Sequence, residues 1–232
     1  MNKDPQHKTD SISSYHADPM QEFLHWYQLL SGANRGRTVN FLRKIFQSIV
    51  GWIIPPLKDF YRPDAITLAT ASKQGRPSAR IVLFKGIQSN GFTFFTSYAG
   101  RKARELEENP YACMVFHQKF PPRQIRIEGK VSKLERHLSE KYWSGRAVNS
   151  QLGAMAGHQS QVIESPEVLN LKVHQLEKLY KNKPIPCPEY WGGYVLIPDR
   201  YEFWTGKAFR IHHRVEYKLV AENTWEKAFL AP

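Results

Sequence analysis

Short extended segments joined by tight turns most constrain what this chain can fold into. Residues 66–71, 79–85 and 92–96 are rich in apolar and β-branched side chains. Residues 73–75 form a turn signal between the first two segments, and Asn90-Gly91, a strong hairpin signal, stands just before the third. This spacing predicts three strands in quick succession.

The rest of the chain continues this pattern with few helices. Further strands are predicted at 111–116, 124–134, 194–197, 201–204, 211–217 and 225–230. Helices are predicted from Asp18-Pro19, an N-cap followed by a first-turn proline, at 101–109 and 138–144, and from Ser165 onward. Many short strands without regular helix alternation favour a mainly β, antiparallel barrel or sandwich over a doubly wound sheet.

The distribution of apolar residues sets the expected domain organisation. The polar residues 1–17 are expected to form a flexible N-terminal tail, and residues 18–232 a single domain. Within an inserted segment at about 35–60, residues 39–57 are apolar, but charged residues interrupt them, whereas a membrane-spanning helix needs about 20 mostly apolar residues. An amphipathic helix packed on its own domain is the default interpretation, and a helix resting on a membrane surface is the alternative.

The charge balance limits the possible partners. The formal net charge of +12 indicates a polyanionic partner, a membrane surface or phosphorylated small molecules, although a basic surface without a specific partner explains it equally well. Two cysteines, Cys113 and Cys187, exclude a disulfide framework. His212-His213 has no matching carboxylate or cysteine pattern, so no metal is expected. No leader segment is visible, and we expect a cytoplasmic protein.

Two pairs of cations lie where anionic ligands could bind. Arg80 and Lys85 stand at the two ends of one predicted strand, and their odd spacing places the side chains on opposite sides of a regular strand. Arg101 and Lys102 begin a predicted helix, where exposed backbone N–H groups favour a phosphate and cations are unfavourable without one. Solvated surface charge is the ordinary alternative for both pairs.

Two further clusters have the composition of anion sites. Tyr142 and Arg146 share a helix face if the helix continues that far, and with Ser150 they could clamp a phosphate. Alternation places Arg210, His212 and Arg214 on one face of a strand, where each opposed pair of like charges costs up to about 1 kcal/mol. A bound anion would relieve that repulsion. Ordinary surface residues are the alternative for the first of these clusters.

Longer stretches of the chain are similar to those of a known family. The chain resembles the pyridoxamine 5′-phosphate oxidase family from about Asp18 to Pro232. The matching stretches, which agree in order and spacing, are ARIVLFKG, FTFFTS followed by GRKARELEENP, RQIRIEGKV, NSQLGA followed by HQS, WGGY, EFWTG, RIHHR and the closing LAP. The resemblance implies an FMN-binding split barrel, an antiparallel Greek-key fold with peripheral helices.

The resemblance also implies roles for individual residues. The positions that match flavin-holding ones are Arg80, Ile81, Val82, Leu83, Phe84, Lys85, Phe95, Thr96, Arg101, Lys102, Gln124, Gln159, Ser160, Trp204 and Arg214. The positions that match those gripping the substrate phosphate are Lys85, Tyr142, Arg146 and Ser150. Arg210 and His212 match the catalytic pair that lies over the substrate ring. The family is a homodimer with FMN at the interface, built from both subunits.

The implied activity belongs to vitamin B6 salvage. Pyridoxine 5′-phosphate and pyridoxamine 5′-phosphate are oxidised to pyridoxal 5′-phosphate when a hydride leaves C4′ for flavin N5, and O2 then reoxidises the flavin and yields H2O2. The flavin carries this chemistry, and the protein supplies position and electrostatics. We expect Arg210 to stack on the substrate ring and His212 to orient a ring substituent.

Three departures from the family pattern keep other interpretations open. The family usually carries an Arg and a Tyr near the N-terminus that close over the substrate, but here Tyr15 is the only early aromatic residue and no arginine precedes Arg35. His213 replaces the aspartate of the family's RLHDR, and residues 35–60 are longer than the usual link. The main alternative is a relative that binds FMN or pyridoxal phosphate without turnover, as a carrier or regulator. A basic nucleic-acid or membrane-surface module is a third interpretation, which the clustering of cations at strand ends disfavours; no nucleic-acid partner is expected.

Overall fold

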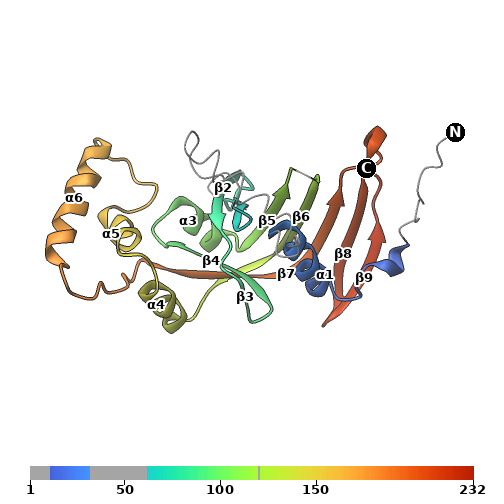
Figure 1. Ribbon diagram of the computed structural model, residues 1–232, viewed down its shortest axis with the longest axis horizontal. Helices are drawn as coiled ribbons and strands as arrows, with labels where there is room; N and C mark the ends of the chain where they lie inside the picture. Colours follow the sequence, from blue (N-terminus) through green and yellow to red (C-terminus); the bar gives the residue numbers. More distant parts are fainter. Residues whose placement is uncertain (1–10, 32–61, 120) are drawn as a thin grey trace, which may run out of the picture. The chain divides into compact units, whose positions relative to one another are not determined.

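The computed structural model of this protein describes residues 11–31, 62–119 and 121–232 (Figure 1). The chain divides into two compact units. The first, called unit 1 below, combines residues up to Pro63 with Val115–Ile127 and Asp199–Pro232, and the second, unit 2, combines Asp64–Met114 with Glu128–Pro198. The inserted segment at 35–60 and the amphipathic helix predicted inside it lie outside the described residues.

The strands of unit 2 form an antiparallel sheet whose bounds follow the predicted alternation. They are β1 (Ala65–Ala71), β2 (Pro77–Leu83), β3 (Ile87–Gln88), β4 (Gly91–Ser97) and parts of β5 (Tyr111–Gln118), β6 (Arg123–Lys133) and β7 (Trp191–Thr205). The strand order is β2-β1-β5-β6-β7-β4-β3. β1 pairs with β2 with Ala65 opposite Leu83, and β4 pairs with β7 with Ser97 opposite Trp191.

The hairpin turn predicted at Asn90-Gly91 is present one residue earlier, at Ser89 and Asn90, and Gly91 begins β4 opposite Gln88. Ser89 and Asn90 have φ values of 49° and 58° before β4, as a two-residue hairpin turn requires. Gly129 in β6 allows a close approach to β7, because a Cβ atom at this position would overlap the carbonyl oxygen of Ile197. These positions fix the strand register, and with it the side chains that share a face.

Apolar residues alternate inward along the strands and form the core of unit 2. In β1 the buried residues are Ile66 and Leu68, and in β4 Phe92 and Phe94 are fully buried. Four helices accompany the sheet: α3 (Arg101–Glu108), α4 (Arg136–Ser144), α5 (Val148–Ala156) and α6 (Pro166–Leu179). α5 and α6 pack side by side (Figure 1).

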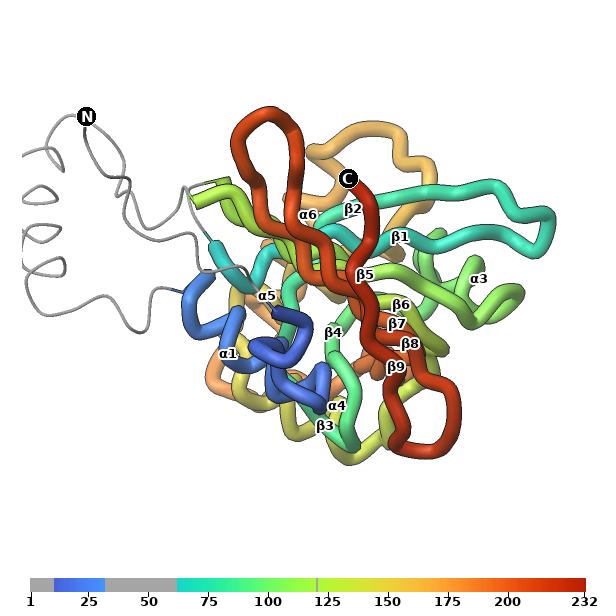
Figure 2. Tube along the Cα trace, turned by 90° about the vertical axis from the view of Figure 1, so that its right-hand side faces the viewer, coloured from blue at the N-terminus to red at the C-terminus, as the bar shows by residue number. Residues whose placement is uncertain are grey.

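The described part of unit 1 includes a helix and the C-terminal hairpin. It contains α1 (Pro19–Ser31), the end of β7, β8 (His213–Ala221) and β9 (Thr224–Phe229), and Figure 2 shows the last two strands running beside each other. The apolar stripe predicted for α1 is buried: the ring of Phe23 lies 5.2 Å from that of Phe116, and the ring of Trp26 lies 5.2 Å from that of Phe203.

The predicted N-terminal tail is described only in part. Residues 11–17 lie in unit 1, where Lys227 Nζ donates to the carbonyl of Tyr15 at 2.8 Å and the Tyr217 hydroxyl donates to that of His16 at 2.7 Å. The flexibility of residues 1–17 and the single domain at 18–232 stay predictions.

Most predicted elements are confirmed, with some differences in number and bounds. The helices expected from Asp18-Pro19, at 101–109, at 138–144 and from Ser165 are present as α1, α3, α4 and α6. The strands expected at 194–197 and 201–204 are one strand, β7, because the chain stays extended through Pro198. The helix α5 was not predicted, because Val148–Ala156 has small and polar residues without a clear apolar stripe. Among the described helices, none is long and apolar enough to cross a membrane.

Candidate functional site

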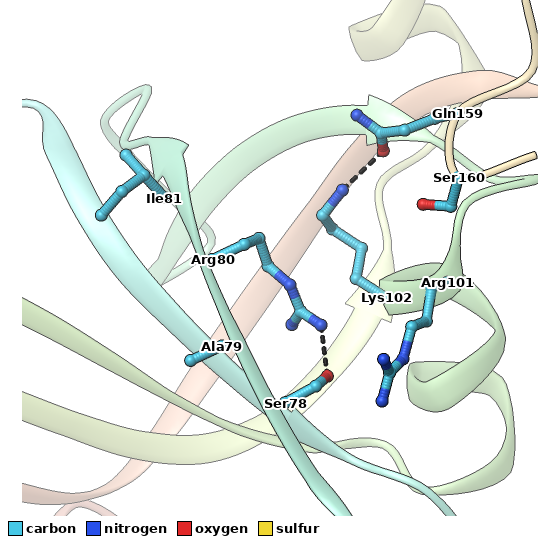
Figure 3. A pocket seen from close by; sticks show the side chains of 8 residues that line it. All are labelled: Ser78, Ala79, Arg80, Ile81, Arg101, Lys102, Gln159 and Ser160. Atoms are coloured by element: carbon cyan, nitrogen blue, oxygen red, sulfur yellow. Dashed lines mark hydrogen bonds between the residues drawn. The ribbon is translucent and has the colours of Figure 1, made fainter.

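A cationic cavity of about 400 Å³ opens in unit 2 between β2, the start of α3 and the segment after α5 (Figure 3). It is lined by Ser78, Ala79, Arg80, Ile81, Arg101, Lys102, Gln159 and Ser160. Six of these residues are among the predicted flavin-holding positions. We call this space the first cavity.

Arg80 is fixed in the first cavity by neighbours on β1, β2 and α3. Its guanidinium donates to the carbonyl of Leu68 and to the hydroxyls of Thr70 and Ser78. It also forms an ion pair with the buried carboxylate of Glu105, with Nη2 and Oε2 3.1 Å apart. The guanidinium therefore has a defined position before any ligand arrives.

Glu105 organises this cationic cluster. Burial opposes ionisation of its carboxyl group, but hydrogen bonds from Ser78, Thr70, Arg101 and Arg80 outweigh burial and lower its pKa to about 2. Arg101 Nε donates to Oε1 at 2.8 Å, one helical turn away. Glu105 is therefore ionised at neutral pH.

Lys102 is a buried cation whose direct partners are neutral. It is only 7% exposed, and Nζ donates to Thr96 Oγ1 at 3.1 Å and to Gln159 Oε1. Burial and the nearby charge of Arg80, partly offset by Glu105, lower its pKa to about 8. A buried ammonium without a bonded carboxylate is stabilised by an incoming anion.

The start of α3 adds backbone donors to the same cavity. Gly100 is the N-cap and supplies no side-chain acceptor, and the first turn contains no acidic residue. The first N–H groups of a helix are therefore available to an anion. With Arg80, Arg101 and Lys102 against Glu105, three cations face one carboxylate, which suits a phosphate ester.

A second cavity of about 330 Å³ lies elsewhere in unit 2. Its lining residues are Lys85, Gln88, Phe95, Leu138, Lys141, Tyr142 and Gly145. The Tyr142 ring stacks on Phe95 with centroids 3.8 Å apart, and Lys85 Nζ lies 3.1 Å from Asp64 Oδ2. Three of the lining residues are predicted site residues, and two lysines give the cavity a positive charge.

Arg146 lies near the residues of the second cavity, but it is not placed there by helix periodicity. Because α4 ends at Ser144, the helix does not continue to Arg146, and the condition for a shared helix face with Tyr142 is not met. Both instead contact Trp191: Tyr142 stacks with it at 6.1 Å between centroids, and the Arg146 guanidinium lies 4.7 Å from its ring centroid. Arg146 Nη2 donates to the backbone carbonyl of Ser150.

The predicted site residues Trp204, Arg210, His212 and Arg214 lie in unit 1, where Arg214 contacts the buried Glu202. Arg214 donates to both oxygens of this buried carboxylate, at 2.8 and 3.1 Å, and Arg126 Nη2 lies 2.8 Å from Oε2. The hydrogen bond to Glu202 raises the pKa of Arg214, against a smaller effect of burial. The Trp204 and His212 rings contact at 4.7 Å between centroids.

The strand face predicted for Arg210, His212 and Arg214 is wrong. Strand β8 begins only at His213, and Ala208–Arg210 forms a 3-10 helix. Phe209 and Arg210 have φ values of 56° and 62°, and His212 N–H donates to the carbonyl of Arg210. This turn interrupts the alternation on which the prediction depended.

The alternation argument for Lys85 also fails, because β2 ends at Leu83. The two side chains nevertheless serve different sites, since Arg80 lines the first cavity and Lys85 lines the second. Val82 and Phe84 are buried in the core, whereas the Ile81 side chain is 64% exposed at the first cavity.

Four further residues of the predicted sites are placed as follows. Thr96 bonds Lys102 and Gln159, Leu83 and Gln124 are half-buried, and Ser150 is exposed.

Several residues that shape these sites were not predicted. Glu105 and Trp191 fall within matching stretches but were given no role, although the spacing of Arg101 and Glu105 on one helix would have indicated an ion pair. Ser78, Thr70 and Asp64 carry no sequence signal, because their partners come from other elements. Within the described ranges, no group of three His, Cys, Asp or Glu side chains could hold a metal ion.

Comparison with family models gives two matches. Residues 55–180 match the model described as pyridoxamine 5′-phosphate oxidase, and residues 191–232 match the pyridoxine 5′-phosphate oxidase C-terminal dimerisation region.

Curated relatives agree with these matches. A pyridoxine/pyridoxamine 5′-phosphate oxidase of Trichormus variabilis is 44% identical over 170 residues, which cover 73% of this chain and 79% of the relative. A pyridoxine-5′-phosphate oxidase of Bos taurus is 44% identical over 160 residues, covering 69% of this chain and 61% of the relative.

Solved structures confirm the fold. PhzG from Burkholderia lata 383, in complex with tetrahydrophenazine-1-carboxylic acid, superposes with a TM-score of 0.78 at 28% identity and 96% coverage of both chains. An FMN binding protein from Nostoc punctiforme, related to pyridoxamine 5′-phosphate oxidase, gives a TM-score of 0.59 at 15% identity, covering 81% of this chain and 97% of its own. The mainly antiparallel split-barrel fold with peripheral helices is therefore confirmed.

Proposed function

Because the chain belongs to the pyridoxamine 5′-phosphate oxidase family and is an oxidase, we propose that it binds FMN and oxidises pyridoxine 5′-phosphate and pyridoxamine 5′-phosphate to pyridoxal 5′-phosphate. O2 is the electron acceptor and H2O2 the second product. The observation that carries this proposal is the presence of two separate cationic cavities in unit 2, one for the phosphate of each ester.

The first cavity fits the FMN phosphate. Arg80, Arg101 and Lys102 would neutralise a phosphate dianion, and the N–H groups at the start of α3 would donate to its oxygens. Lys102 supports this assignment most, since among the described residues its buried ammonium is bonded to a hydroxyl and an amide oxygen and to no carboxylate. The chemistry that FMN supplies when bound is two-electron oxidation of a substrate carbon with O2 as final acceptor.

The residues in and near the second cavity would hold the substrate phosphate. Lys85 and Arg146 provide positive charge, and the hydroxyls of Tyr142 and Ser150 provide donors. Fixing the ester by its phosphate places the reacting carbon in one orientation, which is catalysis by proximity.

Arg210 and His212 would complete the site over the substrate ring. The backbone N–H of Lys207 donates to His212 Nδ1 at 3.2 Å, so a neutral His212 ring carries its proton on Nε2. This proton can be donated to a ring substituent of the substrate. We assign His212 an orienting role and Arg210 a stacking role, in accordance with the positions that they match in the family.

We propose a homodimer with FMN at the subunit interface. The match of residues 191–232 to a dimerisation region supports this assembly. Several apolar residues in the described part of unit 1 are exposed, most of all Phe209 at 94% and Ile211 at 64%, and burial against a second subunit would stabilise them.

Two alternatives remain to be separated by experiment. His213 in place of an aspartate favours a relative that binds FMN or pyridoxal phosphate without turnover. The similarity to PhzG, whose structure contains a tricyclic carboxylic acid, favours an oxidase for a carboxylate substrate.

Purified protein should be yellow, and peroxide should be measured after addition of each phosphate ester, of pyridoxine and of tetrahydrophenazine-1-carboxylic acid. The proposal predicts peroxide from the two esters. A yellow protein without turnover supports the carrier, and peroxide only from the tricyclic acid supports the carboxylate oxidase. Arg80→Ala should weaken FMN retention, whereas Arg210→Ala should reduce turnover with FMN retained.

A further inference from the structure

Three aromatic rings form a nearly parallel stack beside the second cavity. Phe95 stacks on Tyr142 with centroids 3.8 Å apart, and Trp191 lies 5.7 Å from Phe95 and 6.1 Å from Tyr142. The interplanar angles are 12°, 16° and 9°. Phe95 and Tyr142 stack face to face, and Trp191 lies parallel beside that pair at a similar distance from both rings, so the neighbouring rings restrict the tilt of each.

Arg146 lies against the indole of Trp191. The centre of its guanidinium is 4.7 Å from the Trp191 ring centroid and 5.5 Å from that of Trp143, and the two indoles meet edge to face at 4.7 Å. These distances are within the range in which a cation is attracted to the face of an aromatic ring. Two indoles therefore hold one guanidinium.

No carboxylate neutralises Arg146 in the part of the chain that the structure describes. Its hydrogen bond there goes to the backbone carbonyl of Ser150, and its buried Nε atom has no hydrogen-bond partner among the described residues. Lys85 differs, since Asp64 lies 3.1 Å from its ammonium group. An aromatic face orients a guanidinium without cancelling its charge, so the charge remains available to an anion.

The backbone holds Trp191 itself in place. The side chain is 3% exposed, its backbone N–H donates to the carbonyl of Pro188, and its carbonyl accepts from Arg136 Nη1 at 3.0 Å. Pairing with Ser97 in β4 fixes the start of β7. The indole is thus a rigid surface.

We infer that Trp191 is a positioning residue that holds Arg146, on its ring face, in the orientation that receives the substrate phosphate. This inference rests on the proposed function, because it assigns the anion at Arg146 to the ester. Trp191 acts through Arg146 and does not itself touch the substrate.

The test compares Trp191→Leu and Trp191→Phe in the FMN-loaded enzyme with a control of equal burial on the same strand. Tyr194→Leu removes another buried ring of β7, one that stacks on Phe94 at 5.4 Å and is 4% exposed. KM and kcat for pyridoxine 5′-phosphate, and the Kd of inorganic phosphate by calorimetric titration, are measured for each variant. FMN content is read from the visible spectrum.

For Trp191→Leu we expect both KM and the phosphate Kd to rise about tenfold, equal to about 1.4 kcal/mol, with kcat within about twofold of wild type. Trp191→Phe keeps a smaller aromatic face and should show an intermediate rise. Tyr194→Leu should leave KM and the phosphate Kd unchanged. If Trp191→Leu fails to fold, Trp191→Phe decides the question.

A double-mutant cycle separates positioning from a general structural effect. In Arg146→Ala enzyme, adding Trp191→Leu should raise KM and the phosphate Kd no further, because the residue through which Trp191 acts is gone. Additive effects of the two substitutions, or an equal rise in the Tyr194→Leu control, would overturn the inference. So would unchanged KM and Kd in a folded Trp191→Leu protein. If the wild-type enzyme oxidises neither ester, the proposed function fails, while the phosphate Kd values still decide the role of Trp191.

Discussion

Replacing Lys102 with methionine should stabilise the FMN-free protein and weaken its binding of FMN. Methionine keeps much of the volume of the lysine stem but removes the buried charge. Lys102 is buried, its hydrogen-bond partners in the described part of the chain are neutral, and its pKa is lowered from 10.5 to about 8. The folded protein therefore disfavours the charged form, and lowering a pKa by one corresponds to about 1.4 kcal/mol.

The size and pH dependence of this effect follow from the lowered pKa. At pH 7 the charged Lys102 destabilises the FMN-free fold by about 3 kcal/mol relative to the unfolded chain, in which the pKa is ordinary. Between pH 8 and 10.5 the unfolded chain binds the proton and the folded chain does not, so wild-type stability from this group rises with pH. The gain on substitution should therefore shrink across that window.

Two measurements check this prediction. Urea unfolding of FMN-free wild type and Lys102→Met at pH 7 should show the variant to be more stable, and the difference should be smaller at pH 9.5. Fluorescence titration with FMN at pH 7 should show affinity at least about tenfold weaker, as expected for loss of one charge-assisted contact. A variant that is less stable at pH 7 and binds FMN as wild type does would refute the assignment of Lys102 to the FMN phosphate.

Three further substitutions test the supporting carboxylates. Glu105→Gln should destabilise the fold by about 3 kcal/mol at pH 7, as measured by urea unfolding. Because the carboxyl pKa is lowered to about 2, the difference in stability from wild type should disappear as the pH falls from 4 towards 2. Asp64→Asn should lower KM for pyridoxine 5′-phosphate by about two- to fivefold. Asp64 competes with the substrate phosphate for Lys85, and a partly exposed ion pair of this kind contributes up to about 1 kcal/mol. An increased KM would contradict this. Glu202→Gln should destabilise the protein by about 2 to 4 kcal/mol in thermal unfolding, whereas the more exposed Glu216→Gln should change stability by less than about 1 kcal/mol.

Local patterns in the sequence were sufficient to predict most of the fold. Strand alternation and turn residues such as Asn90-Gly91 are short-range signals, and the corresponding strands and hairpin are present. The helix start at Asp18-Pro19 and the buried stripe of α1 follow from the same kind of signal. These features depend on neighbours within a few residues of each other.

The predictions that failed depended on regular elements continuing beyond their ends. The turn at Ala208–Arg210 places Phe209 and Arg210 at positive φ, outside regular helical geometry, and residue type does not indicate this because neither is glycine. The end of α4 at Ser144 similarly separated Tyr142 from Arg146, yet tertiary packing brought both to Trp191.

Contacts between distant elements were not accessible from the sequence. Glu105 on α3 bonds Thr70 and Ser78 on two strands, and nothing in the local sequence of these residues indicates the cluster. Grouping cations by position along the chain found the residues of both cavities, but the structure was needed to divide them between a first and a second phosphate position.

The central claim is that two separate groups of cations in one chain each bind a phosphate ester. Phosphorus NMR of the protein loaded with FMN and pyridoxal 5′-phosphate tests it most directly. We predict two bound phosphate resonances, of which Lys102→Met weakens only that of FMN and Arg146→Ala only that of the vitamin ester. A single bound resonance, or two resonances that neither substitution affects, would contradict the account.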